Sequence, residues 1–256
     1  MKIMKNIRRI ATAVAFSATG LAAQAAMASP VKNVVLVHGY FADGSGWQAV
    51  SEILTRDGYK VSVVQMPETS FKDDIAATKR IVDAQDGPTI LVGHSYGGAV
   101  ITEAGNDARV AGLVYVAAFQ PEAGESLHSL TEKMPATTKA IKSTRDGHLY
   151  LEPSHFRADF AADVPEAETA FMASSQVMPA VESFTAPVTQ PAWRARPSWA
   201  IVASADRTVN PNLERWMAKR ANSAIVEVAS SHAAYLSHPS DVAGVIERAA
   251  TETGNR

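Results

Sequence analysis

The sequence predicts an α/β protein in which a doubly wound, mainly parallel sheet is covered by helices on both faces. Short apolar runs alternate along the chain with segments of helical periodicity. The runs are apolar nearly throughout, which is typical of strands buried on both faces. Polar motifs directly follow several of these runs, at the carboxyl ends where ligands bind in such sheets.

The elements can be predicted in chain order from these runs and from helix start and stop signals. A capping-box-like pair, Ser70 and Asp73, begins the second helix, and Gly87-Pro88 ends it. Pro211 and Pro239 stand where a first helical turn tolerates proline. The predicted elements are strand 34–37, helix 47–57, strand 61–64, helix 70–85, strand 89–92, helix 97–104, strand 110–117, strand 199–203, a helix from 210, strand 224–228 and a final helix after 239.

The rhythm of strands and helices breaks between about residues 120 and 196, where no clear strand is visible. Because a structureless loop of this length is rare in a compact domain, we expect a mostly helical cap inserted before the last two strands. Its large apolar residues fit either a cap core or a substrate pocket. Its three histidines lack the spacing of metal ligands, so no metal site is expected. These residues are Phe156, Phe160, Phe171, Met172 and Met178, and His128, His148 and His155.

Residues 1–28 predict a secretory signal peptide. A basic start precedes an apolar, alanine-rich segment at 10–23, and an A-x-A cleavage pattern ends at Ala28. The apolar segment is short for a membrane span, so no anchor is expected after cleavage. Cleavage after Ala25 is an alternative, and Arg8-Arg9 is a weak indication of twin-arginine export. The mature protein is expected in the periplasm or the medium.

The composition of the full sequence limits the kind of protein that the mature chain, residues 29–256, can form. The 256-residue sequence has a net charge of −2, 46% hydrophobic residues and no cysteine. These values fit one soluble domain with a sizeable core, and they exclude disulfides and thiolate metal sites. Because there is no basic excess, we expect no nucleic-acid partner. The oligomeric state is left open.

Ser95 is the candidate nucleophile. It stands in the pattern Gly93-x-Ser95-x-Gly97, between the apolar strand 89–92 and a helix. A serine at the tip of such a tight turn is held in a strained backbone conformation, and only small residues fit two positions before and after it. The following helix offers free backbone N–H groups and a positive dipole end.

A serine hydroxyl is a poor nucleophile near neutral pH and needs a base, for which His232 is the best-placed histidine. It follows strand 224–228 and precedes the final helix. His238 is the alternative, although its position before Pro239 favours a capping role. His38 and His94 lie within other motifs, where we expect them to shape turns.

The histidine in turn needs an acid that fixes its tautomer, and Asp206 is the candidate. It follows strand 199–203, whose loop neighbours that of His232 if the last two strands are adjacent. Two alternatives stay open: Asp206 pairs with Arg207 at the surface, or Glu122 supplies the acid. The order Ser95, Asp206, His232 matches the order of the triad in α/β-hydrolases.

Two backbone N–H groups are needed to stabilise the tetrahedral oxyanion. One is expected from Tyr96, immediately after the nucleophile. The other is expected from Tyr40, in the loop that follows the first strand, where Gly39 lets the backbone come close. The alternative interpretation of His38-Gly39 is an ordinary tight turn with no role in catalysis.

Taken together, these motifs make the chain similar to the α/β-hydrolase superfamily across nearly all of its mature length. Its size and cap position resemble the branch of plant methylesterases, hydroxynitrile lyases and related bacterial esterases. The lyases of that branch carry threonine and lysine where this chain has Gly39 and Ala233, which favours the esterase side. Dehalogenases and epoxide hydrolases of this fold have aspartate in place of Ser95.

The resemblance implies a serine hydrolase that cleaves small to medium carboxylic esters through an acyl-enzyme, with no cofactor. The same triad would serve for lactone, amide or carbon–carbon hydrolysis or for cofactor-free perhydrolysis. A non-catalytic small-molecule binder is a further alternative, because a fold alone does not fix function.

Overall fold

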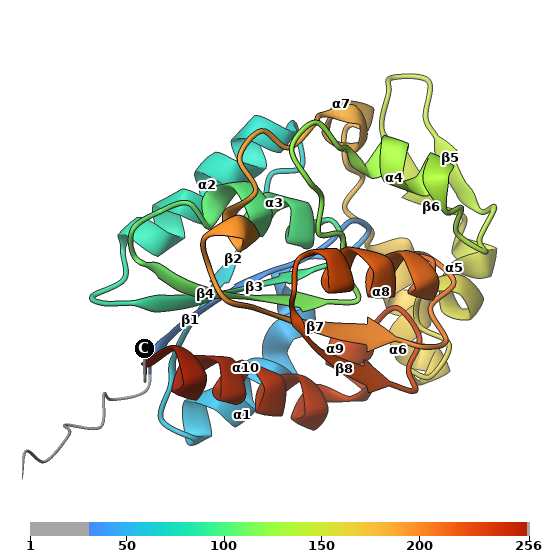
Figure 1. Ribbon diagram of the computed structural model, residues 1–256. Coiled ribbons are helices and arrows are strands. Elements are labelled where there is room, and N and C mark those ends of the chain that lie inside the picture. Colours follow the sequence, from blue (N-terminus) through green and yellow to red (C-terminus); the bar gives the residue numbers. More distant parts are fainter. Residues whose placement is uncertain (1–30, 255–256) are drawn as a thin grey trace, which may run out of the picture.

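The computed structural model describes residues 31–254, and the predicted signal peptide lies outside them. One six-stranded sheet forms the centre of the molecule (Figure 1). Every pairing within it is parallel, which confirms the predicted fold class. Its strands are β1 (Asn33–Val37), β2 (Lys60–Val64), β3 (Thr89–His94), β4 (Val110–Val116), β7 (Ser198–Ala203) and β8 (Ala224–Val228), in the order β2-β1-β3-β4-β7-β8.

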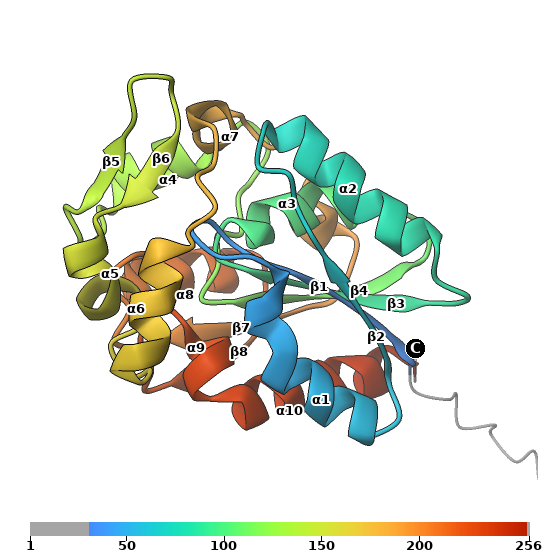
Figure 2. The ribbon, with the colours of Figure 1, turned by 180° about the vertical axis from the view of Figure 1, so that it is seen from behind.

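Helices cover both faces of the sheet, so the central strands carry apolar side chains on both sides. Helices α2 and α3 lie above the sheet in Figure 1, and α1 and α10 lie below it; Figure 2 shows the same layers from behind. No helix among the described residues is long and apolar enough to cross a bilayer. The helices around the sheet are η1 (Gly44–Trp47), α1 (Gln48–Arg56), α2 (Phe71–Asp83), α3 (Gly97–Ala104), α8 (Pro211–Arg220), α9 (Ala234–Ser237) and α10 (Pro239–Gly254).

Between β4 and β7 the chain forms a further group of elements, most of which lie at the right of Figure 1. The expectation that this segment holds no strand is wrong, because β5 and β6 pair as an antiparallel hairpin. Each strand has only three residues, too few to reveal an alternating pattern. The elements are α4 (Leu127–Lys133), β5 (Ile141–Ser143), β6 (Leu149–Leu151), α5 (Pro153–Phe160), α6 (Glu166–Ser174), α7 (Val181–Thr185) and η2 (Ala192–Arg194).

The base of this inserted segment is closed by two backbone hydrogen bonds. The N–H of Gly124 donates to the carbonyl of Val188 at 2.8 Å, and the N–H of Val188 donates to Glu125 at 2.9 Å. A further bond, from the N–H of Ala180 to the carbonyl of Glu68, joins α7 to the loop before α2. The inserted segment therefore leaves and rejoins the sheet layer at one point.

The apolar residues of the inserted segment divide into buried and exposed groups. Phe156 and Phe160 are fully buried, whereas Phe171 and Met178 are exposed. The histidines lie apart, each within 4 Å of an acidic neighbour. Within residues 31–254, no group of three potential metal ligands comes together.

Candidate active site

Ser95 stands on a strained turn between β3 and α3. Its φ of 53° lies in the left-handed region, which residues other than glycine rarely adopt. The glycines around it have no room for a side chain. A Cβ on Gly97 would lie 2.4 Å from the carbonyl oxygen of His38, and one on Gly98 would lie 2.2 Å from that of Phe119. Glycine is therefore required at these positions because the loops that follow β1 and β4 press against the turn that carries Ser95.

His232 is fully buried against the residue that precedes Ser95. Its ring centroid lies 4.6 Å from that of His94, whose Nε2 is 3.0 Å from the carbonyl oxygen of His232. Burial holds the pKa of His94 well below its ordinary value, so this neutral ring donates that bond. Phe160, from the inserted segment, packs edge-on against His232 at 5.0 Å.

The Nε2 atom of His232 has no hydrogen-bond partner among the described residues, Ser95 included. The opposite nitrogen, Nδ1, lies 2.5 Å from Oδ2 of Asp206. The other oxygen of Asp206 accepts hydrogen bonds from the backbone N–H groups of Thr208 and Val209, at 2.7 and 2.8 Å. Asp206 is only 3% exposed, and these bonds fix its orientation toward the imidazole.

The alternative residues lie elsewhere. Arg207 pairs with Asp159 rather than with Asp206, at 2.8 Å. Glu122 forms an ion pair with Arg194 at 2.9 Å. His238 is partly exposed and lies 2.8 Å from the hydroxyl of Ser237. None of these has a hydrogen bond or ion pair with His232.

The loop after β1, which carries Gly39 and Tyr40, lies against Ser95. A Cβ on Gly39 would lie 2.6 Å from the Cβ of Ser95, so glycine is required for this approach. The backbone N–H groups of Tyr40 and Tyr96 donate no hydrogen bond to any described residue. Both predicted donors are therefore available.

A cavity of about 410 Å³ opens beside Ser95. Its walls are mainly apolar and include Phe41, Phe119 and Phe184. Among the described residues that line it, the only charged ones are Lys139 and Lys142, near the β5–β6 hairpin. Such a site fits a largely apolar ligand with few polar contacts.

Several buried acids near the site were not predicted from the sequence. Burial, and then the charge of Asp206, raise the pKa of Glu214 well above its ordinary value. Glu214 accepts a hydrogen bond from the N–H of Ala203, at the end of β7. Asp74 and Glu68 are also buried, and Asp74 bonds the hydroxyl of Tyr96 at 2.6 Å. For Asp74 on α2 and Glu214 on α8 the only sequence signal is an acidic residue on an otherwise apolar helix face, and Glu68, in the loop before α2, has no such signal.

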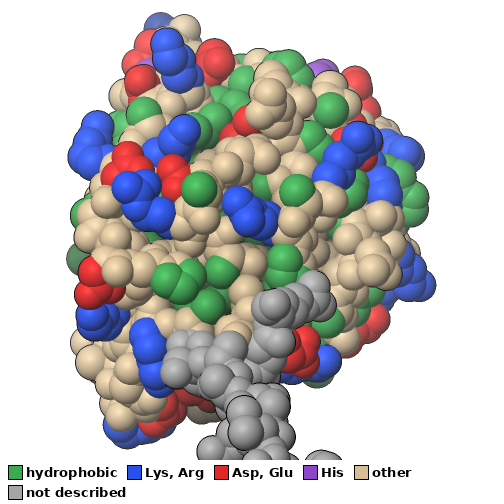
Figure 3. All heavy atoms as spheres, turned by 60° about the vertical axis from the view of Figure 1, so that its left-hand side comes forward, with side chains coloured by type: hydrophobic (Ala, Val, Ile, Leu, Met, Phe, Trp, Pro, Cys, Tyr) green, Lys and Arg blue, Asp and Glu red, His purple; other side chains and the backbone are tan. Residues whose placement is uncertain are grey.

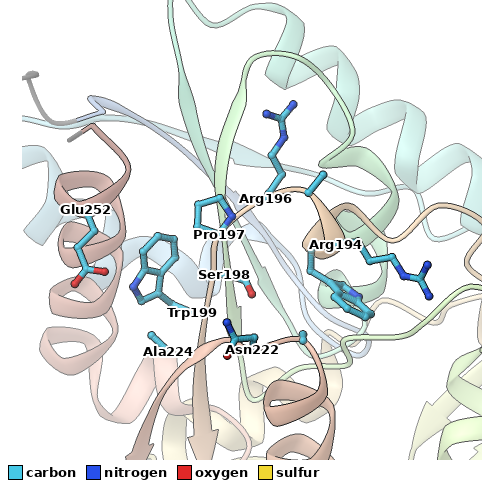
Figure 4. Close-up of a pocket in the computed structure, with 11 residues that line it drawn as sticks. Arg194, Arg196, Pro197, Ser198, Trp199, Asn222, Ala224 and Glu252 are labelled. Atoms are coloured by element: carbon cyan, nitrogen blue, oxygen red, sulfur yellow. The ribbon is translucent and has the colours of Figure 1, made fainter. Parts of the chain in front are cut away.

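A second hollow, of about 530 Å³, lies at the opposite end of the sheet. It is bounded by Arg194, Arg196, Trp199 and, on α10, Glu252 (Figure 4). Since Trp199 and Ala224 stand at the amino ends of β7 and β8, this hollow is remote from Ser95.

Basic and acidic side chains are interspersed on the face shown in Figure 3. This mixture accords with the net charge of −2, and the described residues visible on that face form no continuous basic surface.

Comparison with known sequences supplies independent information. A model of the alpha/beta hydrolase family matches residues 34–245. Alpha/beta hydrolase nvfD of Aspergillus novofumigatus is 28% identical over 245 residues, covering 86% of this chain and 96% of its own. A carbendazim hydrolyzing esterase of a Nocardioides species is 34% identical over 115 residues, covering 40% of this chain and 48% of its own.

Solved structures with the same fold include hydrolases and esterases. A pyrethroid hydrolase from Sphingobium faniae superposes with a TM-score of 0.73 at 23% identity, covering 85% of this chain and 96% of its own. A methylesterase from Arabidopsis gives a TM-score of 0.73 at 18% identity, with coverages of 86% and 98%. Tomato methylketone synthase I gives 0.75 at 16% identity, with coverages of 87% and 99%. At these identities the likeness concerns the fold.

Proposed function

The chain belongs to the alpha/beta hydrolase family and is an enzyme of the hydrolase type, and from that premise we propose that it cleaves small to medium carboxylic esters through a Ser95–His232–Asp206 triad. The observation that carries the proposal is the 2.5 Å contact between Nδ1 of His232 and Oδ2 of Asp206. With Nδ1 donating to this carboxylate, the lone pair of Nε2 is free to accept a proton.

In the proposed reaction, Oγ of Ser95 attacks the ester carbonyl carbon while Nε2 of His232 takes the hydroxyl proton. The tetrahedral adduct collapses, the bond to the alcohol oxygen breaks, and His232 gives its proton to that oxygen. Water then attacks the acyl-enzyme with His232 again as the base, which releases the acid and restores Ser95. We expect the hydrogen bond from Ser95 to His232 to form when substrate binds. Catalytic hydrogen bonds are often long in the free enzyme and shorten in the substrate complex.

The proposed oxyanion hole consists of the backbone N–H groups of Tyr40 and Tyr96. Neither is engaged with a described residue, and Gly39 brings the first loop against Ser95. Fixed donors of this kind stabilise the charge that develops on the carbonyl oxygen.

The cavity beside Ser95 supports the proposed substrate class. A volume of about 410 Å³ with mainly apolar walls suits an ester of modest size better than a polymer. The similar proteins include a carbendazim hydrolyzing esterase and a pyrethroid hydrolase, which supports a hydrolytic reaction.

The proposal can be tested with a serine-directed fluorophosphonate and a panel of chromogenic esters of graded acyl length. The wild-type protein should be labelled at Ser95 and should hydrolyse the panel, whereas Ser95→Ala should lose the label and at least ~10³-fold in turnover. A folded Ser95→Ala variant with full activity would refute the assignment. Labelling without turnover on esters would direct the search to lactones, amides or carbon–carbon bonds.

We also propose that the protein is exported to the periplasm or the medium. The basic start, the apolar segment 10–23 and the cleavage pattern ending at Ala28 support this. The intact mass of protein recovered outside the cytoplasm tests it, and a mass that retains residues 1–28 would contradict it.

A further inference from the structure

Two tyrosines pack face to face beneath the candidate site. The rings of Tyr40 and Tyr96 stack with centroids 4.1 Å apart and planes 20° apart, and we call them the tyrosine stack. Their side chains are 6% and 0% exposed. The backbone N–H groups of these same two residues are the proposed oxyanion donors. The two stacked side chains therefore belong to the residues whose backbone N–H groups must keep a fixed position to bind the oxyanion.

The hydroxyl of Tyr96 is tied to α2. It donates a 2.6 Å hydrogen bond to Oδ2 of Asp74, whose Oδ1 accepts the backbone N–H of Glu68 at 2.8 Å. Burial raises the pKa of Tyr96 well above its ordinary value, so the hydroxyl keeps its proton and remains a donor. Asp74 is 0% exposed, and a buried carboxylate is strongly bound to the donors it has.

The hydroxyl of Tyr40 is tied to α7, in the inserted segment. It lies 2.7 Å from Oγ of Ser183. Ser183 donates its own proton to the carbonyl of Ala180 at 2.8 Å, so Tyr40 is the donor in the shorter bond. Helix α7 is joined to the start of α2 as well, because the N–H of Phe71 donates to Glu182 at 2.9 Å.

We propose that the tyrosine stack is a positioning device for the oxyanion hole, held from α2 by Asp74 and from the inserted segment by Ser183. Each ring is fixed at its face by the other ring and at its tip by a hydrogen bond. A ring fixed in this way limits the rotation of its own backbone, and preorganised donors are what stabilises an oxyanion. Tyr40, Tyr96, Asp74 and Ser183 act through geometry and are positioning residues.

This inference rests on the proposed function, because a hole is needed only if Ser95 forms a tetrahedral adduct. It adds that the inserted segment takes part in holding the hole, through Ser183. Burial raises the pKa of Asp74 to about 6, which means that its ionised form is costly to bury. Costly groups of this kind cluster at functional sites.

The experiment compares Tyr96→Phe and Tyr40→Phe with Tyr115→Phe. Tyr115 is a matched control, since its hydroxyl is also buried and lies 3.0 Å from Thr102 in the core. The readouts are kcat and KM for one chromogenic ester and the inhibition constant of a trifluoromethyl ketone, which forms an oxyanion on Ser95. Each stack variant should lower kcat about 10-fold with KM nearly unchanged, because loss of a whole donor costs about 10²–10³-fold.

The inhibition constant should rise by the same factor as kcat falls, and Tyr115→Phe should change neither. Ser183→Ala provides a second route if a stack variant fails to fold, and it should reproduce the effect of Tyr40→Phe. The inference is overturned if the folded stack variants and Ser183→Ala match Tyr115→Phe while Ser95→Ala is inactive. Full activity of Ser95→Ala would instead overturn the proposed function together with the inference.

Discussion

Nδ1 of His232 and Oδ2 of Asp206 lie 2.5 Å apart, although the two residues are 26 positions apart in the chain. The adjacent strands β7 and β8 bring their loops together, and the N–H of Ala205 donates to the carbonyl of Ser230 at 3.0 Å. The carboxylate is already oriented by two backbone N–H groups, so it holds the imidazole in a single tautomer.

Asp206→Asn should therefore leave the fold intact and lower kcat by about 10³- to 10⁴-fold, because the amide favours the wrong imidazole tautomer. Steady-state kinetics on a chromogenic ester provide the measurement. Asp86→Asn is the control, since Asp86 is exposed and forms an ion pair with the exposed Lys60. Equal turnover in both variants would exclude Asp206 from the triad.

Gly98→Ala should destabilise the protein and reduce its activity. The added methyl group would meet the carbonyl oxygen of Phe119 at 2.2 Å, and the turn that carries Ser95 would have to shift. Gly244→Ala is a matched control on α10, where an added methyl group has nothing within 4 Å and should stabilise the helix by about 0.5–1 kcal/mol. The melting temperature should thus fall for Gly98→Ala and rise for Gly244→Ala. A shift in the same direction for both variants would contradict the predicted clash with Phe119.

Glu68→Gln should become increasingly stabilising as pH rises. Burial, and then the charge of Asp74, raise the pKa of Glu68 from 4.5 to about 10. Between these values the folded state holds one proton more than the unfolded state, so the free energy of unfolding falls as pH rises. One proton corresponds to at most about 1.4 kcal/mol per pH unit.

Melting temperatures from pH 5 to pH 9 test this prediction, with exposed Glu52→Gln as the control. The difference between Glu68→Gln and the wild type should widen with pH. A constant difference would mean that Glu68 titrates normally.

The double variant Lys139→Gln/Lys142→Gln should lower the preference for anionic esters. Within residues 31–254, these lysines are the only charged residues that line the cavity beside Ser95, so we expect them to attract a substrate carboxylate. The ratio of kcat/KM for a hemisuccinate ester to that for a butyrate ester should fall about five-fold at low salt, with a smaller effect at high salt. Lys72→Gln, on α2, serves as the control, and an unchanged ratio in the double variant would remove the lysines from recognition.

The sheet and its order of elements were predictable because each strand is an apolar run bounded by turn residues. The predicted strand 224–228 coincides with β8, and the predicted cap of the second helix is present, with Ser70 accepting the N–H of Asp73. The residues of the candidate triad were predictable because the loops after parallel strands meet at one edge of the sheet.

Contacts that depend on the rotation of a helix or on the path of the inserted segment were not predictable. Asp74 meets Tyr96 only because α2 turns one polar residue inward, and Ser183 meets Tyr40 only because α7 lies over the first loop. Neither pairing leaves a pattern in the sequence, since the partners are 22 and 143 positions apart. The β5–β6 hairpin was missed because strands of three residues show no periodicity.

The two hydrogen bonds that join Gly124 and Glu125 to Val188 also bear on protein engineering. They close the insertion at a narrow neck, so chimaeras with crossovers at this neck would exchange the inserted walls of the cavity beside Ser95 between related hydrolases while retaining the central sheet. A grafted insertion that lacks an equivalent of Ser183 would, by the same geometry, arrive without its hold on Tyr40.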